Sequence, residues 1–148
     1  MKRFWALVLI LAMVWPGCVG SGEASRRLTL MIYVCGSNLE SGYGSASSDI
    51  QEMIDAGGAG DGVSVLVMTG GTRYWAMGYD PGECQIQELR RRGMRTVWRS
   101  EALNMGSGET LTTLLRYGKE NYPAEDYALI LWDHGGGPLE GLCWDESA

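Results

Sequence analysis

His134, the only histidine of the chain, follows the apolar run 128–132 and the acidic residue Asp133. An imidazole has an ordinary pKa of ~6.5, so this side chain can accept and donate a proton near neutral pH. Three glycines, Gly135 to Gly137, come next. Glycines lack a Cβ atom, so they let the backbone approach a ligand and direct N–H groups toward a developing negative charge. These residue types predict acid–base chemistry at His134.

Two polar residues could act on the imidazole. Adjacent residues of a strand point to opposite faces, so we interpret Asp133 as a carboxylate that caps the loop, with orientation of the imidazole as the alternative. Asn38 follows the first predicted strand, where asparagine is favoured in turns. We interpret Asn38 as a structural turn residue, with a place on the same sheet edge as His134 as the alternative.

The elements that must position these residues alternate between strand and helix. Short apolar runs predict buried strands at 28–34, 63–69 and 127–132. A helix is predicted over 48–56 from the capping-box spacing of Ser48 and Gln51, and a second helix follows Ser107 to about residue 121. Short polar-aromatic segments at 73–79, 84–89 and 94–99 predict an antiparallel excursion. The result is an α/β fold with a mostly parallel sheet that is incomplete in this chain.

The first residues are typical of an export signal. Lys2 and Arg3 precede twelve apolar residues, and Pro16, Gly17 and Cys18 follow. A bilayer-spanning helix needs about 20 residues, so we predict a signal peptide over 1–17 and a tether over 18–27. Cys18 stands where a bacterial lipoprotein carries its lipid, and ordinary signal cleavage is the alternative. We expect an exported protein that meets a membrane only through that lipid.

Charge and cysteine spacing exclude other classes of function. The net charge is −6 and becomes −8 when Lys2 and Arg3 leave with the signal peptide, which disfavours nucleic-acid binding. The cluster of Arg90, Arg91, Arg92 and Arg95 is interpreted as a solvated turn or edge strand, with an anion-binding patch as the alternative. The spacing of the cysteines fits no zinc site, so no cofactor is predicted from the residues.

Three stretches together resemble the clostripain-like cysteine peptidases, relatives of caspases, gingipains and legumains. They are MIYVCGSNLES (31–41), LNMGSGETLTTLLRYGKENYPAEDYALILWDHGGG (103–137) and GLCWDE (141–146). The resemblance implies a caspase-like three-layer α/β/α domain whose N-terminal part is residues 28–148. It implies that His134 activates a cysteine thiol and returns a proton to the leaving amine. It also implies that the Gly135 N–H stabilises the oxyanion.

The resemblance leaves the nucleophile outside the chain. In the family, the cysteine lies a few dozen residues after the histidine, whereas Cys143 is nine positions away, so we interpret Cys143 as a packed thiol. We expect the chain to be inactive alone and to need a C-terminal half or heavy chain that carries the nucleophile. A truncated frame or domain fragment is favoured over a processed light chain. The implied substrate is a polypeptide, with cleavage after Arg or Lys and calcium dependence as family expectations.

Two other functions stay open. His134 with its three glycines also matches the oxyanion-hole signature of some α/β-hydrolase esterases, whose serine would lie in a later G-x-S-x-G turn. A non-enzymatic surface lipoprotein that binds glycans or proteins is the second alternative. Its contact aromatics would be Tyr74, Trp75, Tyr79, Trp98 and Trp144.

Overall fold

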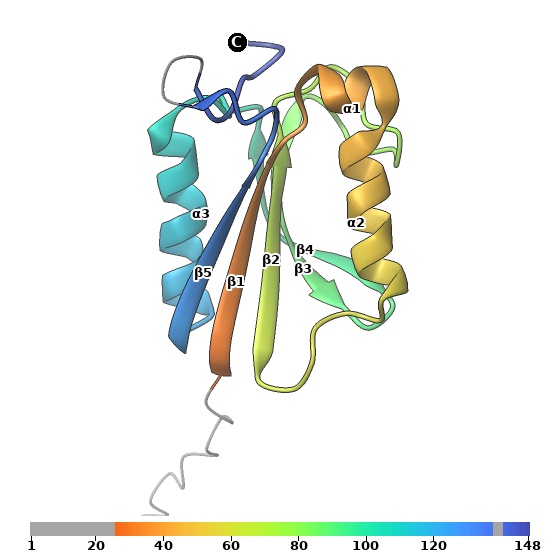
Figure 1. The fold of residues 1–148 in the computed structure, drawn as a ribbon. Coiled ribbons are helices and arrows are strands. Elements are labelled where there is room, and N and C mark those ends of the chain that lie inside the picture. The colour runs from red at the N-terminus through yellow and green to blue at the C-terminus, as the bar shows by residue number, and fades with distance from the viewer. Residues whose placement is uncertain (1–25, 138–140) are drawn as a thin grey trace, which may run out of the picture.

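The computed structural model describes residues 26–137 and 141–148, which form five strands and three helices (Figure 1). The strands are β1 (Arg26–Cys35), β2 (Val63–Gly70), β3 (Glu83–Arg90), β4 (Gly93–Glu101) and β5 (Ala124–Trp132); the helices are α1 (Ser37–Tyr43), α2 (Ser45–Asp55) and α3 (Gly108–Asn121). The predicted signal peptide and the tether up to residue 25 lie outside the described residues. Within the described part, no helix is long and apolar enough to cross a bilayer.

All five strands form one mixed sheet in the order β4-β3-β2-β1-β5. β1 pairs in parallel with both β2 and β5, which confirms the three predicted parallel strands. β3 and β4 form the predicted antiparallel hairpin, and β3 continues the main sheet because it pairs with β2. The segment 73–79 is a loop, so its expected place in the excursion is wrong.

Helices cover both faces of the sheet and make a three-layer α/β/α arrangement (Figure 1). Alternate residues of β1 and β2 enter two separate cores. Met31, Tyr33, Leu66 and Met68 pack on the α3 side with Leu114, whereas the other core holds Ile32, Val34, Val65, Val67, Ile50 of α2 and the buried Trp75. α3 begins where the sequence predicts, since the Ser107 hydroxyl accepts a hydrogen bond from the Glu109 N–H at 3.2 Å. The expected α/β architecture is confirmed.

β5 is the least covered strand of the sheet. It pairs only with β1, and Leu129, Ile130 and Leu131 are 40%, 45% and 36% exposed. The prediction of a buried strand here is therefore wrong for the described part of the chain. The apolar composition is that of an interior strand, but no further strand among the described residues lies beside β5.

α2 starts three residues earlier than the capping-box spacing predicts. Gly44, at φ +66°, joins α1 to α2, and Ser48 lies inside the helix. The Glu40 carboxylate of α1 is buried and accepts hydrogen bonds from the Ser47 N–H at 2.9 Å and the Ser47 hydroxyl at 2.5 Å. Because Glu40 satisfies a donor in the first turn of α2, the helix needs no cap from Ser48.

Candidate functional site

His134 and Asn38 meet at the carboxyl ends of two neighbouring parallel strands. β5 ends at Trp132 opposite Val34 of β1, so the segments that follow the two strands open on one edge of the sheet. His134 lies in the loop after β5, and Asn38 lies in the first turn of α1. The imidazole Nε2 is 2.6 Å from Oδ1 of Asn38. Asn38 is therefore helical rather than a turn residue, and the alternative place beside His134 is confirmed.

This contact fixes the chemistry available at each ring nitrogen. An amide oxygen only accepts hydrogen bonds, so Nε2 carries a proton and its N–H donates a hydrogen bond to Oδ1 of Asn38. Nδ1 of the neutral ring is then the nitrogen with a free lone pair, because a neutral imidazole has one donor and one acceptor. Both His134 and Asn38 are exposed residues, so the imidazole lies where a reacting group can approach it.

Asp133 holds the two sides of the site together. Its Oδ1 accepts hydrogen bonds from the Ser37 hydroxyl and from the His134 N–H, both at 2.7 Å, and its Oδ2 accepts one from the Trp144 N–H at 2.5 Å. The interpretation of Asp133 as a loop-capping carboxylate is confirmed. Ser37 was not singled out by the sequence and has a φ of +47°, a region that non-glycine residues rarely adopt. Asp133 thus connects the loop that contains His134 with the start of α1, which contains Asn38.

A cavity of about 320 Å³ opens beside the imidazole. Its wall includes Asn38, His134, Gly136 and Leu142. Gly135 is exposed at φ +68°, and a Cβ atom at this position would meet no atom within 4 Å. Backbone N–H groups at such a turn can approach a ligand closely. The arrangement offers a proton acceptor, backbone donors and space for a bound group on one edge of the sheet.

The C-terminal segment 141–148 closes over this edge. The buried Asp145 accepts a hydrogen bond from the Met105 N–H at 2.8 Å. Glu146 accepts hydrogen bonds from the Arg73 N–H at 3.1 Å and the Ser41 hydroxyl at 3.0 Å. Desolvation acts to raise the pKa of Glu146, but these hydrogen bonds outweigh it and lower the pKa below its usual value. The GLCWDE segment therefore supports the site structurally.

None of the three described cysteines has the properties of an activated nucleophile. Cys35, Cys84 and Cys143 are free thiols, of which the first two are buried. Burial, followed by the nearby charge of Asp133, raises the pKa of Cys143. Burial also raises the pKa of Cys35 and of Cys84. Because the thiolate is the reactive form, the raised pKa of each thiol agrees with the interpretation of Cys143 as a packed thiol.

Of the other residues that the sequence proposes for ligand binding, some lie on the surface and some in the core. The arginine cluster lies at the end of β3, in the turn and on the edge strand β4, as predicted. Trp75 is buried and Trp98 is half-buried against the core, so neither is a surface contact aromatic as the binding alternative requires. Tyr74 and Trp144 are exposed at 59% and 54%. Within residues 26–137 and 141–148, no three His, Cys, Asp or Glu side chains gather as metal ligands would.

Comparison with known proteins gives one consistent family. The sequence model described as the clostripain family matches residues 32–148. Clostripain of Hathewaya histolytica is 28% identical over an alignment of 149 positions, which covers 83% of this chain and 28% of that protein. This chain therefore spans less than a third of the length of that relative.

Solved structures of similar fold are also cysteine proteases by their descriptions. A cysteine protease of B. fragilis superimposes with a TM-score of 0.63 at 18% identity, over 76% of this chain and 92% of that chain. A secreted C11 cysteine protease of Bacteroides thetaiotaomicron, in complex with an irreversible peptide inhibitor, has a TM-score of 0.59 at 24% identity, over 74% of this chain and 30% of that chain. A clostripain of the same species, bound to the peptide inhibitor BTN-VLTK-AOMK, has a TM-score of 0.57 at 15% identity, over 79% of this chain and 99% of that chain.

Proposed function

The chain belongs to the clostripain family, and we propose that it supplies the histidine side of a cysteine endopeptidase whose thiol lies on a polypeptide segment outside these 148 residues. The observation that carries the proposal is the His134–Asn38 contact at the carboxyl ends of β1 and β5. With the Nε2–H group hydrogen-bonded to the Asn38 oxygen, the lone pair of Nδ1 is free to take the thiol proton. The same nitrogen then returns that proton to the leaving amine.

The proposed peptidase cycle uses His134 and Gly135 in these positions. Nδ1 of His134 removes the proton of the incoming cysteine, and the thiolate attacks the carbonyl carbon of the substrate peptide. The carbonyl oxygen becomes an oxyanion that the N–H of Gly135 stabilises. Collapse of this intermediate breaks the C–N bond as the imidazolium protonates the amine, which leaves a thioester. Water, deprotonated by the same imidazole, hydrolyses the thioester and frees the thiol.

The exposed β5 edge supports a completing segment. Leu129, Ile130 and Leu131 present apolar surface, and the outer backbone donors and acceptors of β5 have no strand beside them in the described part. An apolar strand with an unpaired edge favours pairing with another strand. We propose that the completing segment pairs with β5 and ends in the cysteine. If this segment runs parallel to β5, its thiol lies at the carboxyl ends of the strands, beside His134.

We also propose cleavage after Arg or Lys and export of the protein. The peptide inhibitor of the B. thetaiotaomicron clostripain carries the letters VLTK, which end in lysine, and the net charge of −6 favours approach of cationic peptides. Another relative is described as secreted, which agrees with the signal-like residues 1–17. Lipid at Cys18 is the proposed anchor. Replacement of Cys18 by Ala should then move the protein from the membrane fraction to the soluble fraction.

The test of the peptidase uses the chain combined with its cysteine-bearing segment and fluorogenic peptides with Arg, Lys or Asp before the cleaved bond. His134→Ala should lower kcat/KM by about 10³-fold, and Asn38→Ala by about tenfold because the ring loses its orientation. Tyr43→Ala, on a side chain that is 81% exposed, is the control and should stay within twofold. Activity that survives His134→Ala overturns the proposal. Inactivation by a serine-directed reagent but not by a thiol alkylator would favour the esterase alternative.

A further inference from the structure

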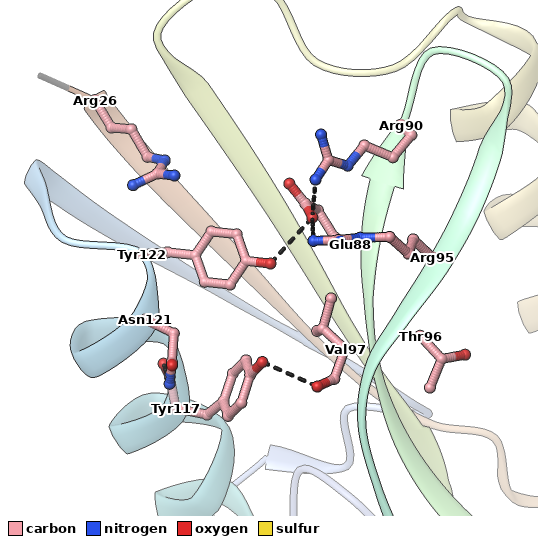
Figure 2. A pocket seen from close by; sticks show the side chains of 9 residues that line it. All are labelled: Arg26, Glu88, Arg90, Arg95, Thr96, Val97, Tyr117, Asn121 and Tyr122. Carbon is pink, nitrogen blue, oxygen red and sulfur yellow. Dashed lines mark hydrogen bonds and ion pairs between the residues drawn. The ribbon is translucent and has the colours of Figure 1, made fainter. Parts of the chain in front are cut away.

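A second cavity, of about 470 Å³, lies at the opposite end of the sheet from His134. It is bounded by the start of β1, the end of α3 and the turn end of the β3–β4 hairpin (Figure 2). Its charged lining residues are Arg26, Arg90, Arg95 and Glu88. Tyr117, Asn121 and Tyr122 provide the wall on the α3 side. The peptidase cycle uses none of these residues.

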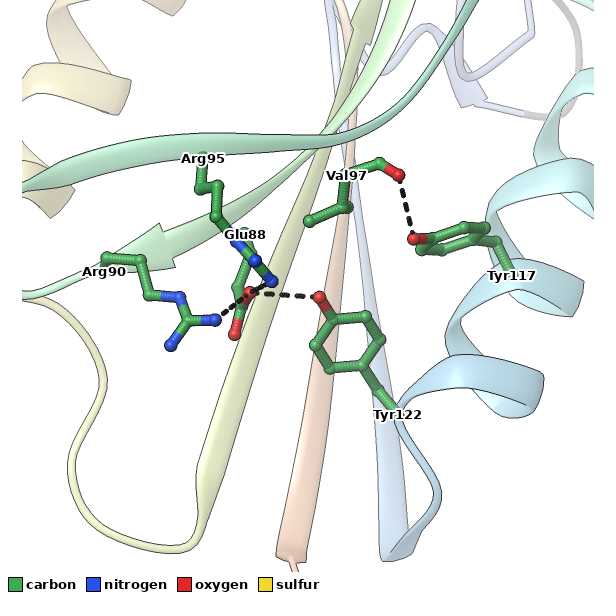
Figure 3. A network of polar contacts seen from close by, with 6 residues as sticks. All are labelled: Glu88, Arg90, Arg95, Val97, Tyr117 and Tyr122. Carbon is green, nitrogen blue, oxygen red and sulfur yellow. Dashed lines mark hydrogen bonds and ion pairs between the residues drawn. The ribbon is translucent and has the colours of Figure 1, made fainter.

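Glu88 holds two of the arginines in fixed positions. Its Oε2 accepts hydrogen bonds from Arg90 at 2.6 Å, from Arg95 at 2.8 Å and from the Tyr122 hydroxyl at 3.0 Å (Figure 3). The Glu88 side chain is 10% exposed, whereas those of Arg90 and Arg95 are 54% and 60% exposed. Each guanidinium has five N–H donors, so both arginines keep donors for another group after binding Glu88.

The electrostatics keep this network ionised. Burial acts to raise the pKa of Glu88, but hydrogen bonds from Arg95 and Tyr122 and the charge of Arg90 outweigh it and lower the pKa. Arg26 approaches from the other side of the cavity, with its guanidinium carbon 5.3 Å from the centre of the Tyr122 ring. Figure 2 shows the guanidinium groups of Arg90 and Arg95 at the Glu88 carboxylate and that of Arg26 apart from them, on the other side of the Tyr122 ring. Three cations and one anion leave two positive charges in excess.

We propose that this cavity binds the phosphate group of an anionic ligand. A phosphate monoester carries close to two negative charges at neutral pH, which matches the excess, whereas a carboxylate carries one. Planar guanidinium groups bind phosphate oxygens through paired N–H donors, and Glu88 and Tyr122 hold these groups before the ligand arrives. The volume exceeds that of a phosphate ion, so the space beside Tyr117 and Asn121 accepts an organic substituent. The site is independent of peptide hydrolysis.

The test is calorimetric titration of the purified chain at constant ionic strength. Inorganic phosphate and phenyl phosphate should bind saturably, phenyl phosphate more tightly, and benzoate should bind at least tenfold more weakly than phenyl phosphate. Arg26→Gln and Arg95→Gln should each weaken phosphate binding about tenfold or more, because each removes charge-assisted hydrogen bonds. Thermal melting confirms that both variants are folded.

Arg99→Gln is the matched control. Arg99 is also on β4, is 55% exposed and pairs with Glu83 at 3.2 Å, yet it does not line this cavity. It should change phosphate affinity less than twofold. The absence of saturable phosphate binding overturns the proposal, and so does an equal loss in Arg99→Gln, which would reduce the effect to general surface charge. Vesicles of phosphatidylcholine with phosphatidic acid form a further arm: retention by them, lost in Arg95→Gln, assigns the phosphate to a lipid headgroup, and no retention assigns it to a soluble ligand.

Discussion

β4 and β5 are the two edge strands of the same sheet, and they differ in the side chains that they expose to water: charged on β4 and apolar on β5. β4 carries Arg95 and Arg99, each in an ion pair with β3, and an irregularity interrupts its pairing opposite Ile86 and Gln87. Charges and bulges of this kind protect an edge strand from pairing with another chain. β5 instead exposes Ile130 and its apolar neighbours. β4 is therefore an edge strand protected against further pairing, whereas β5 has the composition of an interior strand.

The strongest test of this difference puts a lysine on each edge strand in the completed enzyme. Ile130→Lys should lower kcat/KM at least a hundredfold, because a lysine cannot be buried unpaired where a neighbouring strand packs. Glu101→Lys, at an exposed position on β4, should change it less than threefold. Peptide hydrolysis under identical conditions measures both. Equal losses in the two variants would mean that β5 is no different from β4.

The second prediction compares β5 with β2, the other parallel neighbour of β1. Leu66 of β2 is fully buried, so Leu66→Ala should reduce the free energy of unfolding of the chain by about 3 kcal/mol. Ile130→Ala should reduce it by less than about 1 kcal/mol in the chain alone. In the completed enzyme we expect that cost to rise to about 2 kcal/mol. Urea denaturation gives both values, and an unchanged cost for Ile130→Ala would contradict pairing at β5.

Sequence reasoning succeeded where the signal is local. The strands at 28–34 and 63–69 and the helix after Ser107 follow from short apolar runs and a single capping hydroxyl, and all three are confirmed. The burial of β5 could not be predicted, since it depends on what lies beside the strand. The start of α2 was missed because its donor is satisfied by Glu40, seven residues before Ser47 in the chain.

In the candidate site, too, local features could be predicted from the sequence and contacts between distant residues could not. Position after an apolar strand singles out His134, whereas the resemblance to the clostripain-like peptidases singles out Gly135. Their catalytic roles stay proposals. The partnership of His134 with Asn38 depends on the register of β1 against β5, across 96 positions of sequence. Asn38 carried only a weak signal, its place after a strand. The positive φ of Ser37 carried none, because serine has no preference for that conformation.

A third prediction concerns backbone protection at the two edges. In the completed enzyme, amide hydrogens of β5 that face away from β1 should exchange about ten- to a hundredfold more slowly than in the chain alone, because a new strand accepts them. Those of β4 should not change. Hydrogen exchange with mass spectrometry resolves the two segments. Slowing on both edges would indicate general stabilisation, and slowing on neither would exclude pairing at β5.

The smallest expected effect is the contribution of the Glu88 ion pairs to the stability of the β3–β4 edge. The folded-state pKa of Glu88 is lowered, so its ion pairs stabilise the fold above the unfolded pKa of ~4.3 and lose that effect as the pH falls through the folded value. At pH 7, Glu88→Gln should cost about 1–2 kcal/mol, limited by the solvent exposure of Arg90 and Arg95. As the pH falls toward 3, the difference in stability between the variant and the parent chain should narrow.

Denaturation of the chain at the two pH values measures this convergence, with Glu101→Gln as an exposed control expected to stay within about 0.5 kcal/mol at both. A Glu88→Gln penalty that is equal at pH 7 and pH 3 would show that shape rather than charge secures the hairpin. Convergence would instead confirm that ionised groups stabilise β4 against β3. The effect of a substitution at Ile130 of β5 should not depend on pH in this way, because the exposed surface there is apolar. Such a surface is stabilised by pairing with another strand and not by an opposite charge.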